Sequence, residues 1–267
     1  MEAFMPWIEA LFRWVHVVAG VLWIGLLYYF NWINGQVAKQ LDGDTKQKVL
    51  PELLPRTLYF FRWGAAYTFI TGVLLLGMVY YMTSGQGPMG LETPKDMALS
   101  GMAFGVIIVG LIIYDVLWKA MQAKKTAGVA ISYVLLLGIM YVMHAVLGMH
   151  PRGLYIHVGA LFGTCMAFNV WYRIWPMQRK IIAAIKNGTP TEPGWGALAG
   201  LRSKHNTYMS VPLIYIMVAG HVHPQAMNMK IGDAAHGWVA LAVIIALGWW
   251  VTSLIYKKSA KPEVAEY

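Results

Sequence analysis

Residues 98–118 read ALSGMAFGVIIVGLIIYDVLW, a run in which Asp115 is the single charged side chain. A bilayer core about 30 Å thick is crossed by about 20 apolar residues in a helix, because lipid offers the backbone no hydrogen-bond partners. We therefore expect a transmembrane helix over residues 98–120.

Six further apolar stretches flank this one along the chain. We expect them to form helices over 7–34, 59–82, 126–149, 153–175, 201–221 and 236–256. The composition supports this, since 58% of the residues are hydrophobic, 12% are charged and the mean hydropathy is +0.52. The fold expected is an all-α integral membrane protein with one domain over residues 1–267, a bundle of about seven transmembrane helices.

The net charge is +9, but the basic residues lie in short segments between apolar runs. They therefore indicate how the chain is oriented in the membrane, and we expect no nucleic-acid partner. In a bundle of seven helices, most of the basic residues fall in segments on one side. They are Lys39, Lys46, Lys48, Arg56, Lys119, Lys124, Lys125, Arg179, Lys180, Lys186, Arg202, Lys204, Lys257, Lys258 and Lys261. Because short cytoplasmic segments are enriched in Lys and Arg, the N-terminus is expected outside and the C-terminus inside. Residues 177–186 fit either an interfacial amphipathic helix or an extension of the helix before it.

Two glycine pairs and the single cysteine complete the inventory of the helices. Gly101 with Gly105, and Gly159 with Gly163, have the GxxxG spacing that permits close helix packing. Cys165 is the only cysteine, so the chain contains neither an internal disulfide nor a CxxCH motif for covalent haem attachment. Any haem must be held by non-covalent ligands.

The histidines are distributed unevenly across the expected membrane. Seven of the eight fall on the outer half, and only His205 falls on the inner side. Imidazoles inside a membrane are costly and usually functional, and two neutral imidazoles from different helices are what a b-type haem iron requires. For any single histidine, an interfacial or hydrogen-bonding role is the alternative. The cofactor favoured is therefore haem b, in one or two copies.

His16 has the most suggestive neighbours along its helix. Gly20 is one turn deeper and leaves room for a flat macrocycle, whereas Arg13 is one turn nearer the surface, where it could pair with a propionate. His144 is a further candidate metal ligand. Copper held by three histidines is the competing cofactor, and we rank it below haem because the methionines are typical of apolar packing.

A second set of polar residues shares one depth near the inner side. The set consists of Arg62, Asn169, Arg173, His205 and Asn206. It forms either a structural ion-pair network with Asp115 or a pocket for an anionic substrate, and the sequence leaves both open.

Four segments carry a resemblance to a known family. They are 13–31 (RWVHVVAGVLWIGLLYYFN), 54–65 (LPRTLYFFRWGA), 157–179 (HVGALFGTCMAFNVWYRIWPMQR) and 202–212 (RSKHNTYMSVP). In these the chain resembles the urate oxidase N-terminal domain family, the membrane domain of bacterial cytochrome c-linked urate oxidases. The resemblance covers nearly all the expected helices.

The resemblance implies a location in the bacterial inner membrane and electron delivery toward a cytochrome c. It places the family's histidines on His16, His157, His205 and His221, and less securely on His236. The chain ends at Tyr267 without the C-terminal cytochrome c domain of the family's larger members, so we expect a partner to supply the electron acceptor.

Three functions remain in competition, and whether the chain is itself an oxidoreductase enzyme stays open. The first is a b-type haem protein that transfers electrons toward an outer-side cytochrome c or partner complex. The second is a membrane enzyme that oxidises urate or a related purine and uses the haem as acceptor. The third is an accessory subunit of a respiratory or monooxygenase complex. The expected partners are the lipid bilayer, a cytochrome c or larger redox complex, and further copies of the chain.

Overall fold

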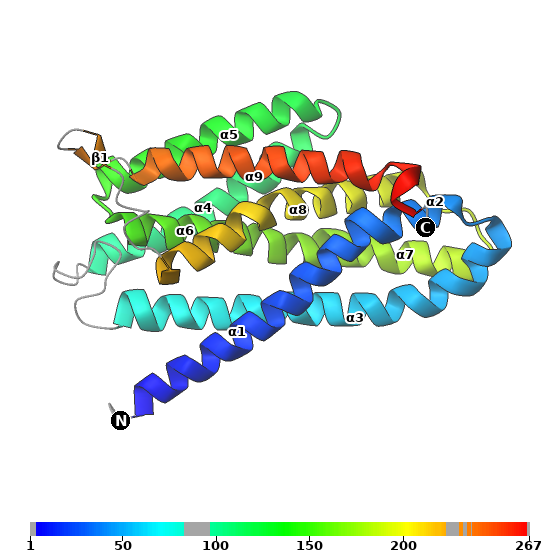
Figure 1. The fold of residues 1–267 in the computed structure, drawn as a ribbon, viewed down its shortest axis with the longest axis horizontal. Coiled ribbons are helices and arrows are strands. Elements are labelled where there is room, and N and C mark those ends of the chain that lie inside the picture. The colour runs from blue at the N-terminus through cyan, green and yellow to red at the C-terminus, as the bar shows by residue number, and fades with distance from the viewer. Residues whose placement is uncertain (1–3, 83–96, 223–229, 232–233, 236, 266–267) are drawn as a thin grey trace. The chain divides into compact units, whose positions relative to one another are not determined.

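The computed structural model describes residues 4–82, 97–222, 230–231, 234–235 and 237–265. This part of the chain is helical almost throughout (Figure 1). Its α-helices are α1 (Met5–Tyr28), α2 (Gly35–Gln40), α3 (Gly43–Leu76), α4 (Met97–Ala120), α5 (Lys125–Tyr141), α6 (Pro151–Asn169), α7 (Trp175–Lys186), α8 (Pro193–Val222) and α9 (Gly237–Ser259). A short 3₁₀ helix follows at Pro262–Ala265. The strands β1 (Lys230–Ile231) and β2 (Ala234–Ala235) pair antiparallel, a small addition to the all-α expectation.

Four π-helical turns join or extend these helices. Tyr29–Asn34 connects α1 to α2, Gly77–Met82 extends α3, Val142–Val146 extends α5, and Val170–Ile174 connects α6 to α7. The described residues therefore form seven long helical bodies, as the sequence predicts.

Six of the seven bodies in the described chain are long and apolar enough to cross a membrane. They are Met5–Gln40, Gly43–Met82, Ala98–Ala120, Lys125–Val146, Pro151–Lys186 and Gly237–Ser259. By helix length and composition, the protein is a multi-pass membrane protein.

Helix α8 is the seventh body and differs from the other six in character. It begins at Pro193, eight residues before the predicted span 201–221, and it does not have the apolar composition of a candidate span. Helix α8 can contain its polar side chains because they are buried against other parts of the protein. Asn206, Thr207 and Ser210 are all 0% exposed. Arg202 also lies on α8, and its side chain is fully buried, although the sequence counts it among the basic residues of an inner-side segment.

Two of the predicted helices extend beyond their expected bounds, one at its start and one at its end. Helix α3 begins at Gly43 instead of residue 59, so Lys46, Lys48 and Arg56 lie on a helix and not in a loop. Its start is capped by Asp42, whose Oδ1 accepts the backbone N–H of Thr45 at 2.9 Å. Helix α7 continues α6 as one helix through residue 186, so the helix-extension interpretation of residues 177–186 is correct.

The chain groups into two compact units. Unit 1 consists of residues 1–71, 166–211 and 248–267, and unit 2 consists of residues 72–165 and 212–247. In unit 1, α1 and α3 approach closely at Gly64, where an added Cβ would lie 3.3 Å from both the Ala19 carbonyl oxygen and the Trp23 Cβ. Trp23 and Phe61 are each 1% exposed, so this contact forms part of the unit's core.

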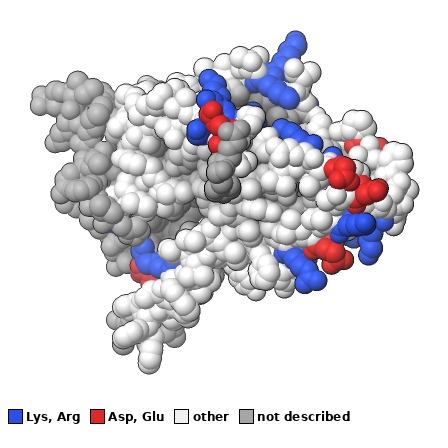
Figure 2. All heavy atoms as spheres, turned by 45° about the vertical axis from the view of Figure 1, so that its right-hand side comes forward, with Lys and Arg blue, Asp and Glu red and all other residues white. Residues whose placement is uncertain are grey.

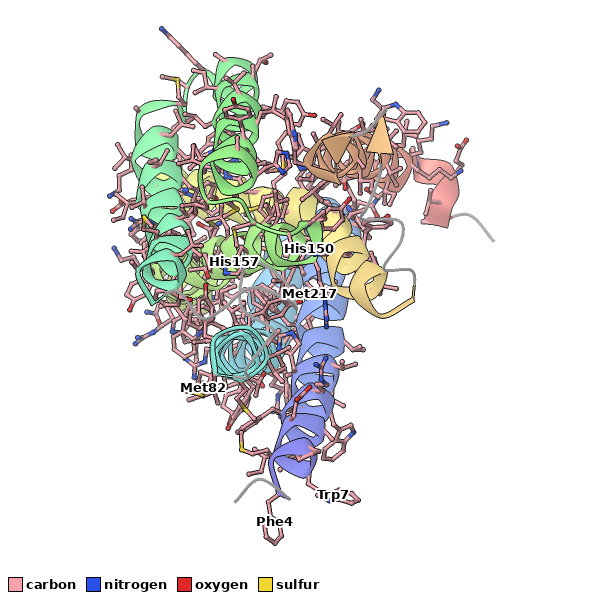
Figure 3. The ribbon with its side chains drawn as sticks, turned by 90° about the vertical axis from the view of Figure 1, so that its left-hand side faces the viewer. Phe4, Trp7, Met82, His150, His157 and Met217 are labelled. Atoms are coloured by element: carbon pink, nitrogen blue, oxygen red, sulfur yellow. The ribbon has the colours of Figure 1, made fainter. Side chains whose placement is uncertain are left out.

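Unit 2 contains a comparable contact between α6 and α8. A Cβ at Gly159 would lie 2.9 Å from both Ile216 Cγ2 and Met217 Cε; Met217 is labelled in Figure 3. In contrast, Gly101, Gly105 and Gly163 have nothing within 4 Å of a built Cβ. Of the two GxxxG pairs, only the Gly159 position packs closely among the described residues.

Much of the surface is apolar, as a lipid-facing protein requires. Figure 2 shows wide areas without charged side chains. Phe4, directly before α1, is 68% exposed, and Trp7 in its first turn is 76% exposed (Figure 3). Val21 further along α1 is 69% exposed. Apolar exposure on this scale would be a liability in water and is expected in a bilayer.

Candidate functional site

His157 lies on α6 in unit 2 and is completely buried (Figure 3). Its Nδ1 is 2.7 Å from the carbonyl oxygen of Gly153, one turn earlier in the same helix. A carbonyl oxygen can only accept, so Nδ1 carries the proton and Nε2 carries the lone pair. The hydroxyl of Tyr81 donates to this Nε2. His157 is thus a neutral imidazole whose acceptor nitrogen, Nε2, is occupied by the hydroxyl of Tyr81.

His16 lies on α1 in unit 1 and has the same arrangement of protons. Its Nδ1 is 3.2 Å from the hydroxyl oxygen of Thr71 on α3. That hydroxyl has one proton, which it donates to the carbonyl oxygen of Tyr67 at 2.6 Å. Thr71 must therefore accept from Nδ1–H, which leaves the lone pair of His16 on Nε2. The sequence predicts His16 as a ligand but contains no signal for Thr71.

Arg13 and Gly20, which the sequence predicts beside a haem, each contact protein groups in the structure. Arg13 donates to Glu9 one turn earlier on α1, with Nη2 2.6 Å from Oε1. A Cβ at Gly20 would meet Thr68 Cγ2 of α3 at 3.7 Å, which is ordinary van der Waals contact. Their expected roles toward a haem remain predictions.

Of the remaining outer-side candidates, His144, His221 and His236, the structure describes the side chain of His144 alone. His144 is half-buried in the π-helical turn Val142–Val146. His221 lies near the end of α8 with its side chain outside the described residues, and His236 is itself outside them. Among the described residues, no three His, Cys, Asp or Glu side chains come together as a metal site, and His16 and His157 belong to different units.

The predicted inner-side set is brought together in part. Asn169 of α6 donates from Nδ2 to Oδ1 of Asn206 at 2.8 Å, and Asn206 donates from Nδ2 to the carbonyl oxygen of Met166 at 2.9 Å. Both asparagines are 0% exposed. Arg202, one turn before Asn206 on α8, is also 0% exposed. Sequence reasoning missed Arg202 because it counted this residue among the cations of an inner segment.

Further neighbours are described for other members of the inner-side set. Arg173 lies in the turn Val170–Ile174, with its Cζ 5.2 Å from the ring centroid of Phe168. His205 is half-buried on α8. Arg62 on α3 stacks on Trp175, with its Cζ 4.2 Å from the ring centroid. Asp115, the carboxylate expected at this depth, lies in unit 2 with Oδ2 2.9 Å from Nζ of Lys119.

The π-helical turns contribute polar residues to both units. The four turns among the described residues include Asn31, Tyr81, His144 and Arg173, of which Tyr81 contacts His157. A π turn inserts an extra residue and so rotates the following side chains around the helix axis, and such turns are frequent at functional sites. Apolar periodicity does not reveal them.

One family of proteins matches the chain. The model of the family described as Urate oxidase N-terminal matches residues 2–49 and 42–266, which together span nearly the whole sequence. No curated protein and no solved structure shows a significant match.

Proposed function

Since the chain belongs to the urate oxidase N-terminal family, as its resemblance in sequence predicts, we propose that it is a membrane-embedded b-type haem redox protein. It transfers electrons toward an outer-side cytochrome c or a larger redox complex in a bacterial inner membrane. Haem b, when bound, supplies one-electron oxidation and reduction.

One observation carries this proposal: in both His16 and His157, Nδ1 lies within hydrogen-bond distance of an oxygen atom, 3.2 Å from Thr71 Oγ1 and 2.7 Å from the Gly153 carbonyl oxygen. These contacts assign the proton to Nδ1 and leave the lone pair on Nε2. Metal-ligating histidines almost always donate their other ring N–H in this way, because the bond sets the tautomer and the ring orientation. Each ring therefore offers the kind of nitrogen donor that haem iron takes, and His16 in unit 1 and His157 in unit 2 are each a residue that would hold a haem.

Three neighbouring groups form hydrogen bonds with the ring nitrogens of these imidazoles. Thr71 and the Gly153 carbonyl orient the rings and keep the proton on Nδ1. Tyr81 occupies Nε2 of His157 with its hydroxyl, so a metal ion can bind there only when Tyr81 releases that nitrogen. Burial of His157 excludes water from the same atom.

The test is optical. We would record reduced-minus-oxidised spectra of the detergent-solubilised protein, with pyridine haemochrome quantitation, for the wild type and for His16→Ala, His157→Ala and His221→Ala. The control is His150→Ala, which removes an exposed histidine between α5 and α6. A b-type signal that is lost in some of the three variants and kept in the control supports the proposal. No haem in the wild type, under conditions where a known b-type cytochrome keeps its own, rejects it in favour of copper or an accessory subunit.

Oxidation of urate or a related purine is the second candidate function. The observation that favours it is the buried group formed by Asn169, Asn206 and Arg202, all 0% exposed. Amide and guanidinium groups recognise the edge of a planar anion through paired hydrogen bonds. A urate analogue that entered this group would exchange the Asn169–Asn206 hydrogen bond for bonds to itself.

Anaerobic mixing distinguishes this function from plain electron transfer. Urate added to oxidised protein should reduce the haem, and His205→Ala and Asn206→Leu should abolish the reduction while dithionite still reduces both variants. Reduction by dithionite but not by urate in the wild type would exclude urate as the donor.

A further inference from the structure

Arg62 on α3 has an unusual environment for a cation, because aromatic rings surround its guanidinium. Its guanidinium lies 4.2 Å from the ring centroid of Trp175, 5.7 Å from that of Tyr59 and 5.8 Å from that of Trp171. Within the described residues it makes neither a hydrogen bond nor an ion pair, and its Nε is buried without a partner. Aromatic faces stabilise the charge of a guanidinium but leave its N–H donors unused.

A second guanidinium shares the same indole. Arg179, one helical turn after Trp175 on α7, has its Cζ 5.8 Å from the Trp175 ring centroid. It too has no carboxylate partner in the described chain. Two like charges held against one ring repel each other unless an anion lies near both. The pair therefore favours an anionic ligand over either cation alone.

The surroundings show from which side such an anion can approach. Beside Arg62 on α3, Tyr59 is 51% exposed and Trp63 is 38% exposed. In a membrane protein an exposed rim of tyrosine and tryptophan faces the lipid headgroup region. Unit 1 also contains 15 of the 21 Lys and Arg residues against 8 of the 12 Asp and Glu residues, a net charge of +7. Exposed aromatic side chains thus lie beside Arg62, in a unit whose net charge is positive.

We propose that Arg62, Trp175 and Arg179 form a binding site for the phosphate group of an anionic phospholipid. The guanidinium N–H groups donate to the phosphate oxygens, the geometry for which arginine is best suited. The acyl chains lie along the exposed aromatic side chains of α3. The ligand is a lipid and not free phosphate because a hydrophilic ion gains nothing from the aromatic rim. This site is separate from the histidines and does not depend on the proposed haem.

Native mass spectrometry of the detergent-solubilised full chain tests the proposal. The probes are phosphatidylglycerol, phosphatidylcholine with the same acyl chains, and inorganic phosphate. The variants are Arg62→Gln, Arg179→Gln and Arg62→Lys, and the matched control is Arg56→Gln. Arg56 lies on the same helix and loses the same charge, but its side chain is 81% exposed and faces Glu52 at 3.7 Å. The thermal midpoint of each variant reports whether the fold is retained.

The expected result is that phosphatidylglycerol binds more tightly than phosphatidylcholine to the wild type. Removing either arginine should lower the affinity for phosphatidylglycerol about fivefold, near the effect of one basic residue at a membrane surface. Arg62→Lys should fall between the wild type and Arg62→Gln, and Arg56→Gln should bind like the wild type. Equal binding of the two lipids, or equal losses in Arg56→Gln and Arg62→Gln, would overturn the proposal. Displacement of phosphatidylglycerol by millimolar inorganic phosphate would also overturn it, since the ligand would then be a soluble anion.

Discussion

The hydroxyl of Tyr81, in the π-helical turn that extends α3, donates a hydrogen bond to Nε2 of the buried His157 on α6. Iron ligation requires this same nitrogen. Tyr81 therefore competes with a metal ion for His157, and removing its hydroxyl should favour the bound state.

We accordingly expect Tyr81→Phe to keep its haem or to bind added haem more tightly than the wild type. The phenyl ring preserves the packing of the tyrosine, and only the O–H donor is lost. Haem-to-protein ratios from pyridine haemochrome assays measure the effect. Loss of haem as complete as in His157→Ala would contradict this and would mean that the tyrosine hydroxyl helps to hold the cofactor.

Thr71→Val should weaken haem binding about 10- to 100-fold, the usual effect of removing the hydrogen-bond partner of a ligating histidine. Valine keeps the shape of threonine but cannot accept from Nδ1–H of His16, which is 3.2 Å away in the wild type. Titration of haem into the apoprotein gives the affinity. The matched control is Thr68→Val on the same helix, because that hydroxyl donates to the Gly64 carbonyl oxygen instead. Equal losses in the two variants would show that the effect is one of packing.

Gly159→Ala should destabilise the protein by about 1–3 kcal/mol, the cost typical of overpacking. The new methyl group would lie 2.9 Å from Ile216 Cγ2 and Met217 Cε, so α6 and α8 would have to separate. Gly163→Ala is the control, since its Cβ would meet nothing within 4 Å. Unfolding of both variants in the same mixed detergent measures the difference. Equal stability of the two variants would argue against close contact at Gly159.

Asp42→Asn should reduce the stability at neutral pH, and the difference from the wild type should shrink in acid. The backbone N–H and hydroxyl of Thr45 donate to the Asp42 carboxylate, which lowers its pKa from the ordinary value of 3.8. A carboxyl whose pKa is lowered by folding stabilises the folded state above its unfolded pKa, and this stabilisation is lost as the pH falls through the folded pKa. Thermal midpoints at pH 6 and pH 3 measure it.

The control for this prediction is Asp44→Asn, which removes the same charge two residues away without removing the cap. If Asp42→Asn and Asp44→Asn behave alike at both values of pH, the effect is one of net charge. A difference from the wild type that stays constant between pH 6 and pH 3 would equally contradict a role for the ionised carboxylate.

The candidate histidines were open to prediction because of where they fall along the chain. An imidazole within an apolar run is costly, so the positions of His16 and His157 alone make them candidates for a functional site. Their partners were not predictable in the same way. Tyr81 is 76 residues from His157, and Thr71 is 55 residues from His16, so no local pattern links either pair.

Six of the seven expected spans follow from the sequence by itself, because the cost of placing a residue in lipid depends on that residue and its near neighbours. Packing of helices distant in sequence decides which polar residues are buried. Only the tertiary structure therefore shows that the side chain of Arg202 is buried and that Arg62 and Arg179 share the ring of Trp175. A cation has no preferred partner until the fold brings one within reach.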